Sequence, residues 1–154
     1  MSLKPLYSKP GHLIRRLQQI ATAIFMEETA HFDITPVQYA ALIAVREHPD
    51  IDVTRLSALI AFDRSTLGSV VERLEAKLLL ERRSGRSDRR TKRLRVTAAG
   101  RKMLQEIEPA VQRAQRRMLA PIPQSERKHF IERLKQLVEI NNVHSRAPMR
   151  PPLD

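Results

Sequence analysis

Apolar residues recur at helical spacing along most of the chain, and turn-forming residues separate the resulting segments. The first segment predicts an amphipathic helix from His12 to about Ala30, because its apolar positions repeat every three or four residues: Leu13, Leu17, Ile20 and Ile24. A second helix is predicted to begin at Thr35-Pro36 and to end near Glu47, since Thr35 can cap it and Gln38 occupies the reciprocal capping-box position. Residues 1–10 contain two prolines and are predicted to form an arm.

The middle of the chain predicts two helices joined by a short turn. The first covers residues 54–60, and the second runs from Arg64 to about Leu79 after the turn Ala61-Phe62-Asp63. Asp63 is predicted to cap the second helix, because its carboxylate can accept hydrogen bonds from free backbone N–H groups. This arrangement is a helix-turn-helix pattern. The inward stripe of the longer helix is predicted to be Leu67, Val70, Val71, Leu74 and Leu78.

The second half of the chain predicts a hairpin and then two more helices. Residues 80–83 and 93–97 nearly alternate between apolar and polar side chains, which predicts two strands with a long tip between them. The helices are predicted from Ala98 to about Ala120 and from Ser125 to about Val143, with Pro121-Ile122-Pro123 between them. The proline-rich tail, residues 145–154, is predicted to be loose.

Charge is concentrated at the hairpin. Residues 82–95 contain eight of the 28 Lys and Arg residues and a single acid, Asp88, so they carry +7 of the formal net charge of +11. A concentrated basic segment indicates a polyanionic partner. Because it follows a helix-turn-helix pattern, the favoured partner is double-stranded DNA.

Composition excludes several classes of function. The chain has no cysteine, which rules out disulfides, thiolate catalysis and Cys-ligated zinc. No apolar run is long enough to cross a membrane and no secretory signal is present, so a cytoplasmic protein is expected. The five histidines show no metal-ligand spacing, and there is neither a nucleophile elbow nor a phosphate-binding glycine loop. We therefore expect no enzyme and no cofactor.

Two alternatives remain open at this stage. A metal-responsive regulator could use the pairs His31 and Asp33 or His48 and Asp50, although such short pairs also arise by chance. A nonspecific DNA-binding or architectural protein would share the basic charge, but it would need neither a capped recognition helix nor a shaped hairpin.

Several segments also resemble a known family. Residues 34–39 (ITPVQY), 63–66 (DRST) and 73–75 (RLE), together with Asp88-Arg89-Arg90 and the sequence LRVTAAG at 94–100, resemble the MarR family of bacterial transcription regulators. The resemblance covers roughly residues 10–140. It implies a single, mainly α domain over residues 1–154, with about six helices and a β-hairpin wing. Residues 10–34 and 98–144 would be dimerisation helices, residues 35–97 the winged helix-turn-helix lobe and residues 145–154 the loose tail.

The resemblance implies roles for the polar residues of the lobe. The second helix of the motif would enter the major groove, with contacts from Arg64, Ser65, Thr66, Ser69 and Arg73. Arg90 would be the wing arginine that enters a narrow minor groove, and Asp88 would hold the wing in shape. The remaining wing cations are expected to contact phosphates without reading sequence: Arg83, Arg86, Arg89, Lys92 and Arg93.

Assembly and ligand binding follow from the same resemblance. Surplus apolar positions favour a homodimer and hence a pseudo-palindromic operator: Leu13, Leu17, Ile107, Val111, Phe130 and Leu134. Many members of this family release DNA when a small aromatic acid binds. The two ends of the chain resemble a subgroup that represses breakdown of nicotinate-type and other aromatic acids. Candidate ligand contacts are His12, Arg16 and Gln19 for the carboxylate, Phe25, Phe32, Tyr39 and Phe62 for the ring, and His144 and Arg146 from the C-terminal end.

Overall fold

The structure is a computed structural model, and it describes residues 3–85 and 90–151. These residues form seven α-helices, two short 3-10 helices and one antiparallel pair of strands. The elements are α1 (Lys4–Tyr7), α2 (Pro10–Glu28), η1 (Ala30–Phe32), α3 (Pro36–Glu47), α4 (Val53–Leu59), α5 (Arg64–Ala76), β1 (Leu80–Ser84), β2 (Lys92–Val96), α6 (Ala98–Leu119), α7 (Gln124–Asn141) and η2 (Asn142–His144). The predicted mainly α fold with a hairpin wing is confirmed. Within the predicted N-terminal arm, the structure has the short, exposed helix α1.

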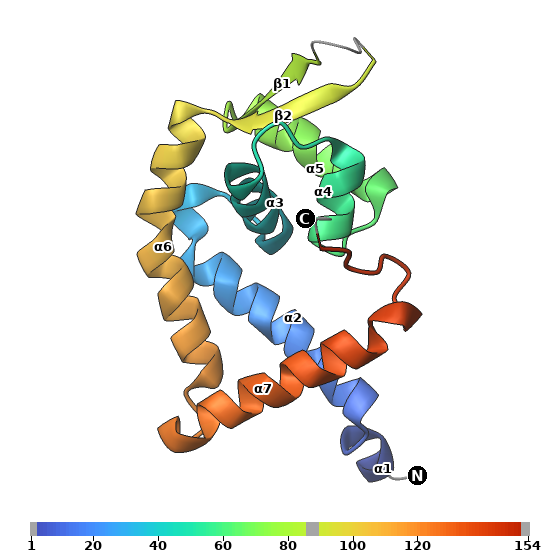
Figure 1. Cartoon of the computed structure of the whole chain (residues 1–154). Coiled ribbons are helices and arrows are strands. Elements are labelled where there is room, and N and C mark those ends of the chain that lie inside the picture. The colour runs from blue at the N-terminus through green and yellow to red at the C-terminus, as the bar shows by residue number, and fades with distance from the viewer. Residues whose placement is uncertain (1–2, 86–89, 152–154) are drawn as a thin grey trace.

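The molecule has two parts, which Figure 1 shows at its upper and lower ends. The helices α3, α4 and α5 and the hairpin form a compact lobe, while α2 and α6 extend away from it and α7 crosses at the far end (Figure 1). The core lies mainly in the lobe, and its largest fully buried side chains include Ile34, Leu42, Leu56, Leu67, Leu74, Leu94 and Ile107. Ile107 and Val111 are buried in this core, so the prediction that they are surplus positions for a dimer was wrong.

Side-chain caps define where the lobe helices begin. The capping box predicted for α3 is present: Thr35 Oγ1 accepts from Gln38 N at 3.3 Å, and Gln38 Oε1 accepts from Thr35 N at 3.2 Å. Asp63 caps α5 as predicted, with its Oδ1 atom 3.3 Å from Ser65 N. Asp52 caps α4 in the same way. These caps satisfy N–H groups that have no partner within their own helix.

The wing is attached to the lobe through its second strand. β1 and β2 pair from Leu80↔Val96 to Ser84↔Lys92. On its other side, β2 bonds to the segment between α3 and α4, because Asp50 N donates to Leu94 O at 3.0 Å and Leu94 N donates to Ile51 O at 2.9 Å. Strand β2 is thus hydrogen-bonded along both of its edges, to β1 on one side and to the segment between α3 and α4 on the other.

Helix α5 is shorter than predicted, which changes the position of Leu78. The helix ends at Ala76, and Leu78 adopts a left-handed backbone conformation with φ 59°. The change of direction takes Leu78 off the helical stripe, and its side chain is 72% exposed instead of buried. The other four predicted positions of the stripe, Leu67, Val70, Val71 and Leu74, are buried as expected.

The C-terminal segment, residues 145–151, belongs to the tail that is predicted to be loose, and the last three residues of that tail, 152–154, lie outside the described residues. It runs from η2 back to the lobe (Figure 1), where Arg150 N donates to Ala58 O at 2.8 Å. Arg146 also donates to Asp63 of the lobe, and Met149 N donates to Asn142 Oδ1 in η2. Its prolines prevent helix formation but leave other backbone and side-chain groups able to bond to the lobe.

A candidate DNA interface

The outer face of α5 is polar and exposed. Arg64, Ser65, Thr66, Ser69 and Arg73 are all exposed, whereas the apolar residues between them are buried. Ser65 Oγ donates to Asp63 Oδ1 at 3.1 Å and Ser69 Oγ donates to Thr66 O at 2.8 Å, so both hydroxyl groups are already oriented. The predicted face therefore exists, and its hydroxyl and guanidinium groups can form hydrogen bonds in a groove.

The cations of the wing differ in their partners. Arg83 lies 2.6 Å from the carboxylate of Glu81, and Arg82 lies 2.9 Å from that of Glu75. Lys92 Nζ donates to Ser84 Oγ at 3.2 Å. Arg90, Lys92 and Arg93 are exposed, while Arg86, Asp88 and Arg89 lie outside the described residues. Part of the positive charge counted along the chain is thus neutralised by acids from β1 and α5.

Sequence reasoning missed the ion pair that holds the wing. Arg95 Nε donates to Asp50 Oδ1 at 2.7 Å and a second guanidinium nitrogen donates to Oδ2 at 2.5 Å. This hydrogen-bonded arginine lowers the pKa of Asp50 below its usual value. Asp50 also has φ 68°, a left-handed conformation that Asp and Asn tolerate better than most residues. No local sequence signal joins Asp50 to a residue 45 positions later.

The same ion pair bears on the metal-responsive alternative. Asp50 is engaged by Arg95, and Asp33 is paired with Lys77 at 2.9 Å. Within the described part of the chain, no group of three or more His, Cys, Asp and Glu side chains could hold a metal ion.

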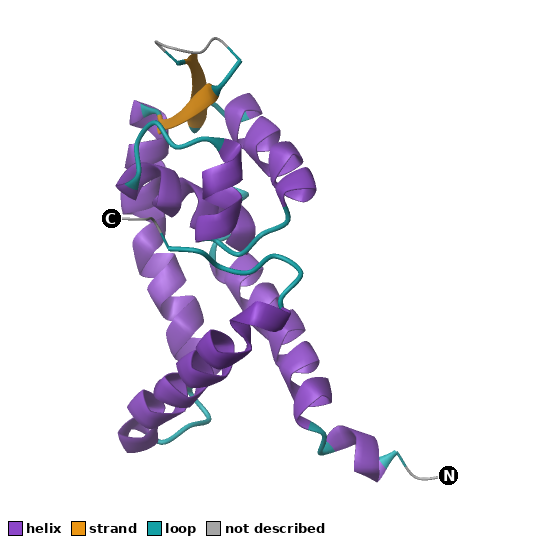
Figure 2. Cartoon of the chain, turned by 45° about the vertical axis from the view of Figure 1, so that its right-hand side comes forward, coloured by secondary structure: helices purple, strands orange, loops and turns teal. Residues whose placement is uncertain are grey.

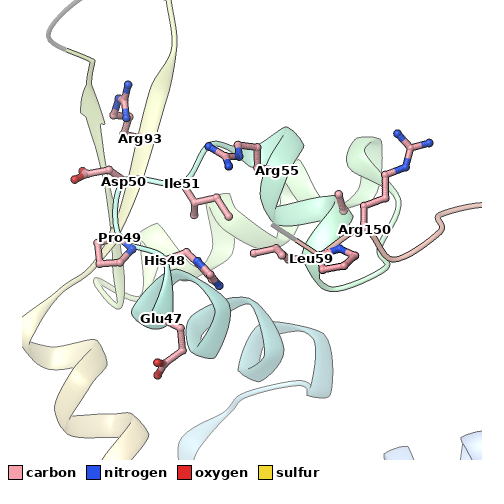
Figure 3. A pocket seen from close by; sticks show the side chains of 11 residues that line it. Glu47, His48, Pro49, Asp50, Ile51, Arg55, Leu59, Arg93 and Arg150 are labelled. Atoms are coloured by element: carbon pink, nitrogen blue, oxygen red, sulfur yellow. The ribbon is translucent and has the colours of Figure 1, made fainter. Parts of the chain in front are cut away.

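A hollow of about 700 Å³ has Asp50 among its lining residues (Figure 3). The side chains of His48 and Arg55 point into the hollow, and Ile51 and Leu59 give it an apolar lining. The C-terminal segment contributes Arg150 and Pro151 at its edge. A second hollow, of about 390 Å³, is lined by residues that include Arg73 and Lys77. Neither hollow is lined by any of the nine predicted ligand residues.

Comparison with known proteins agrees with this geometry. A model of the MarR family matches residues 32–91. The chain is 34% identical to a transcriptional regulatory protein for the hcr operon of Thauera aromatica, over 82% of this chain and 77% of the other. The chain itself therefore belongs to the MarR family. Members of this family are DNA-binding regulators of transcription and not enzymes.

Two further relatives indicate the subgroup. The chain is 27% identical to the transcriptional repressor NicR of Pseudomonas putida, over 84% of this chain and 82% of NicR. It is also similar to the solved structure of BpsR from Bordetella bronchiseptica, whose DNA binding is regulated by 6-hydroxynicotinic acid. That match has a TM-score of 0.78 and 27% identity and covers 84% of this chain and 93% of BpsR. The predicted subgroup of aromatic-acid regulators is therefore supported.

In this MarR protein, the predicted carboxylate contacts lie on α2, and we call His12, Arg16 and Gln19 the α2 row. His12 is half-buried, and Arg16 and Gln19 are exposed. Gln19 accepts from Arg15 at 3.3 Å, which orients its amide along the helix. His12 Nε2 is buried with no hydrogen-bond partner among the described residues, and the imidazole lies 5.8 Å from the ring of Tyr7. Buried polar atoms nearly always have a hydrogen-bond partner, so a buried nitrogen without one is the unusual feature of the α2 row.

The predicted ring contacts pack within the chain itself. Phe25 is buried, and Phe32, Tyr39 and Phe62 pack against the core. Tyr39 lies 5.9 Å from Phe25 between ring centroids and donates its hydroxyl to Glu108 at 2.9 Å. Burial and this hydrogen bond raise the pKa of Tyr39 to about 12. These aromatic side chains line neither hollow.

The two C-terminal ligand candidates lie apart from that row. His144 is exposed in η2, and Arg146 donates to Asp63 at the start of α5. No hydrogen bond or ion pair between described residues joins either one to His12 or Arg16. Among the described residues, no helix is long and apolar enough to span a membrane.

Proposed function

We propose that the protein is a homodimeric repressor that binds a pseudo-palindromic operator and leaves it when a small aromatic or heteroaromatic acid binds. The observation that carries the DNA-binding part is the exposed polar face of α5 beside a basic wing that is anchored at its base. Repression by this protein is supported by its similarity to NicR along most of both chains. As a regulator of bacterial genes, it would act in the cytoplasm.

Dimerisation is supported by apolar side chains outside the lobe. Leu13 and Leu17 on α2 and Val138 and Ile140 on α7 are exposed. None of the residues of α7 is buried, and Figure 2 shows α2 and α7 running in different directions at the end opposite the hairpin. Apolar helix faces without a partner are costly in water, so a second copy is the proposed cover.

The ligand class is supported by chemistry on α2 and by BpsR. Arg16 provides a positive charge one turn from His12, whose Nε2 atom has no partner within the described residues. Both groups can bond a carboxylate. BpsR, whose DNA binding responds to 6-hydroxynicotinic acid, is similar over most of its length. We propose that the acid binds between α2 and the lobe, with side chains from both protomers.

Fluorescence anisotropy tests the proposed repressor directly. The protein is titrated onto the duplex immediately upstream of its own gene and onto a shuffled duplex, with and without benzoates, hydroxycinnamates and pyridine carboxylates. We expect preference for the native duplex that one acid abolishes. Equal binding to both duplexes, unchanged by every acid, would instead support a nonspecific DNA-binding protein.

Two variants separate the ligand site from the DNA interface. Arg16→Ala should leave operator affinity unchanged and reduce the response to the acid, whereas Arg116→Ala, which removes an exposed arginine from α6, should respond normally. A normal response in both variants would remove the α2 row from the ligand site.

Sedimentation of Val138→Glu tests the dimer, because a charge on an apolar interface should shift the protein toward the monomer.

A further inference from the structure

The C-terminal segment connects α7 to the helix-turn-helix through a defined set of hydrogen bonds. At its start, the Asn142 side chain closes a loop over residues 143–148: its Nδ2 donates to Met149 O at 2.9 Å, and its Oδ1 accepts from Met149 N at 2.8 Å. A further bond, from Ala147 N to Ser145 Oγ at 3.2 Å, lies inside this loop. The segment is therefore shaped by its own residues as well as by the lobe.

The segment reaches the lobe at both helices of the motif. Arg150 N donates to Ala58 O of α4, and Arg146 Nη2 donates to Asp63 Oδ2 at 2.9 Å. Asp63 is the N-cap of α5. Its two oxygens have separate partners, because Oδ1 accepts from the backbone and side chain of Ser65 while Oδ2 accepts from Arg146.

We propose that the C-terminal segment is a positioning element for DNA binding, and that Arg146 acts through Asp63 without touching DNA. Asp63 lies at the end of α5 that carries the predicted groove contacts Ser65 and Thr66. A carboxylate at that position repels the phosphates of an approaching duplex. Arg146 neutralises this charge and leaves the capping oxygen in place. The proposal rests on the DNA-binding role of α5.

The geometry favours an effect on DNA binding over an effect on folding. The Arg146 side chain is 87% exposed, and exposed ion pairs contribute little to stability. Beside a polyanion, however, the net charge at the start of α5 changes by one unit when the arginine is removed. The segment also joins this point to α7, so the same contact ties the recognition helix to the part of the chain that we assign to dimerisation.

The test measures operator affinity across a double-mutant cycle of Arg146 and Asp63. Arg146→Gln should weaken binding by about threefold to tenfold, and Arg146→Lys should keep most of the affinity. Asp63→Asn keeps the cap, because Asn caps helices as well as Asp does, but it removes the charge. In the Asp63→Asn background, Arg146→Gln should therefore cause no further loss. Arg116→Gln, an exposed arginine on α6, is the control for general loss of charge.

The Asp63→Asn background distinguishes an effect through Asp63 from direct contact with DNA. An arginine that bound a phosphate itself would still lose that contact in Arg146→Gln after Asp63→Asn, whereas an arginine that only neutralises Asp63 would have no charge left to neutralise. Thermal unfolding and sedimentation should match the unmodified protein. The proposal is overturned if Arg146→Gln binds normally, or if its loss persists in full in the Asp63→Asn background. The first result would make the segment a surface feature only, and the second would make Arg146 a DNA contact.

Discussion

The arginines of this protein differ in whether they form an ion pair and in the acidic residue with which they form it. Arg95 forms a two-point contact with Asp50, Arg82 pairs with Glu75, and Arg146 pairs with Asp63. These side chains hold elements in place, and their charge is largely compensated. Arg73, in contrast, is exposed on the outer face of α5, and its side chain forms no hydrogen bond or ion pair with any described residue, so its guanidinium is available for a groove.

The first prediction concerns Arg90, which is exposed beside β2. Arg90→Ala should weaken operator binding by about 1–3 kcal/mol, as expected for one inserted arginine, with little change in melting temperature. Anisotropy titration and thermal unfolding measure the two quantities. Unchanged affinity would remove Arg90 from the interface. Arg116→Ala provides the control, because it removes the same charge from an exposed position on α6.

The second prediction concerns Asp50. Asp50→Asn retains a residue that tolerates the left-handed backbone but removes the charge that binds Arg95. We expect weaker operator binding through a less firmly held wing, together with a small loss of stability. Because Asp50 has a lowered pKa, that stability is present above its usual value of 3.8 and is lost as the pH falls through the folded value. Acid titration of the variant should lack this component.

Among the elements, β2 and α6 are joined by a closely packed junction. Thr97 caps α6 by accepting from Gly100 N at 3.0 Å, and its hydroxyl donates to Leu78 O at 2.7 Å. Gly100 is buried, and a Cβ placed there would overlap Leu79 O and lie 2.7 Å from Val96 Cγ1. The glycine at the end of the LRVTAAG motif is thus required by close approach of the backbone that precedes β1.

This contact predicts opposite results for two glycine substitutions. Gly100→Ala should destabilise the protein by about 1–3 kcal/mol, because backbone atoms cannot move aside easily. Gly68→Ala, in the middle of α5, meets nothing within 4 Å and should stabilise the helix by about 0.5–1 kcal/mol. Urea unfolding of both variants tests the pair. Similar changes in both would show that the junction is not tightly packed.

At the scale of the whole molecule, ion pairs join the two long helices that leave the lobe. Glu28 at the end of α2 accepts from Arg113 and Arg117 of α6, each at 2.9 Å, and Glu27 accepts from Arg117 as well. The hydrogen bond from Arg117, followed by that from Arg113, lowers the pKa of Glu28 below its usual value of 4.5. These contacts set how α2 and α6 lie against each other.

The pH dependence of unfolding follows from that lowered pKa. The unfolded chain binds a proton at Glu28 at higher pH than the folded chain does, so the contribution is present above 4.5 and is lost as the pH falls through the folded value. We expect the free energy of unfolding to decrease over that range, and to decrease less steeply in Glu28→Gln. Identical acid slopes for the two proteins would show that this ion pair contributes nothing to stability.

Local patterns in the sequence determined most of the elements and the exposed face of α5. The capping box at Thr35 and the cap at Asp63 depend only on residues within three positions, and helical periodicity identifies a buried stripe without reference to the rest of the chain. The basic run and the family resemblance added the DNA partner. Leu78 marks the limit of periodicity, since the pattern continues for two residues after the helix has ended.

Only the tertiary structure decided which residues hold these elements together. Asp50 meets Arg95, Glu75 meets Arg82, and Asp63 meets Arg146 across separations of up to 83 residues, and the order of residues alone does not specify such contacts. The C-terminal segment lacks helical periodicity, so only its hydrogen bonds to Ala58 and Asp63 reveal that it lies against the lobe. Local propensity depends on neighbours in the chain, whereas ion pairs and close backbone contacts depend on how distant segments come together in space.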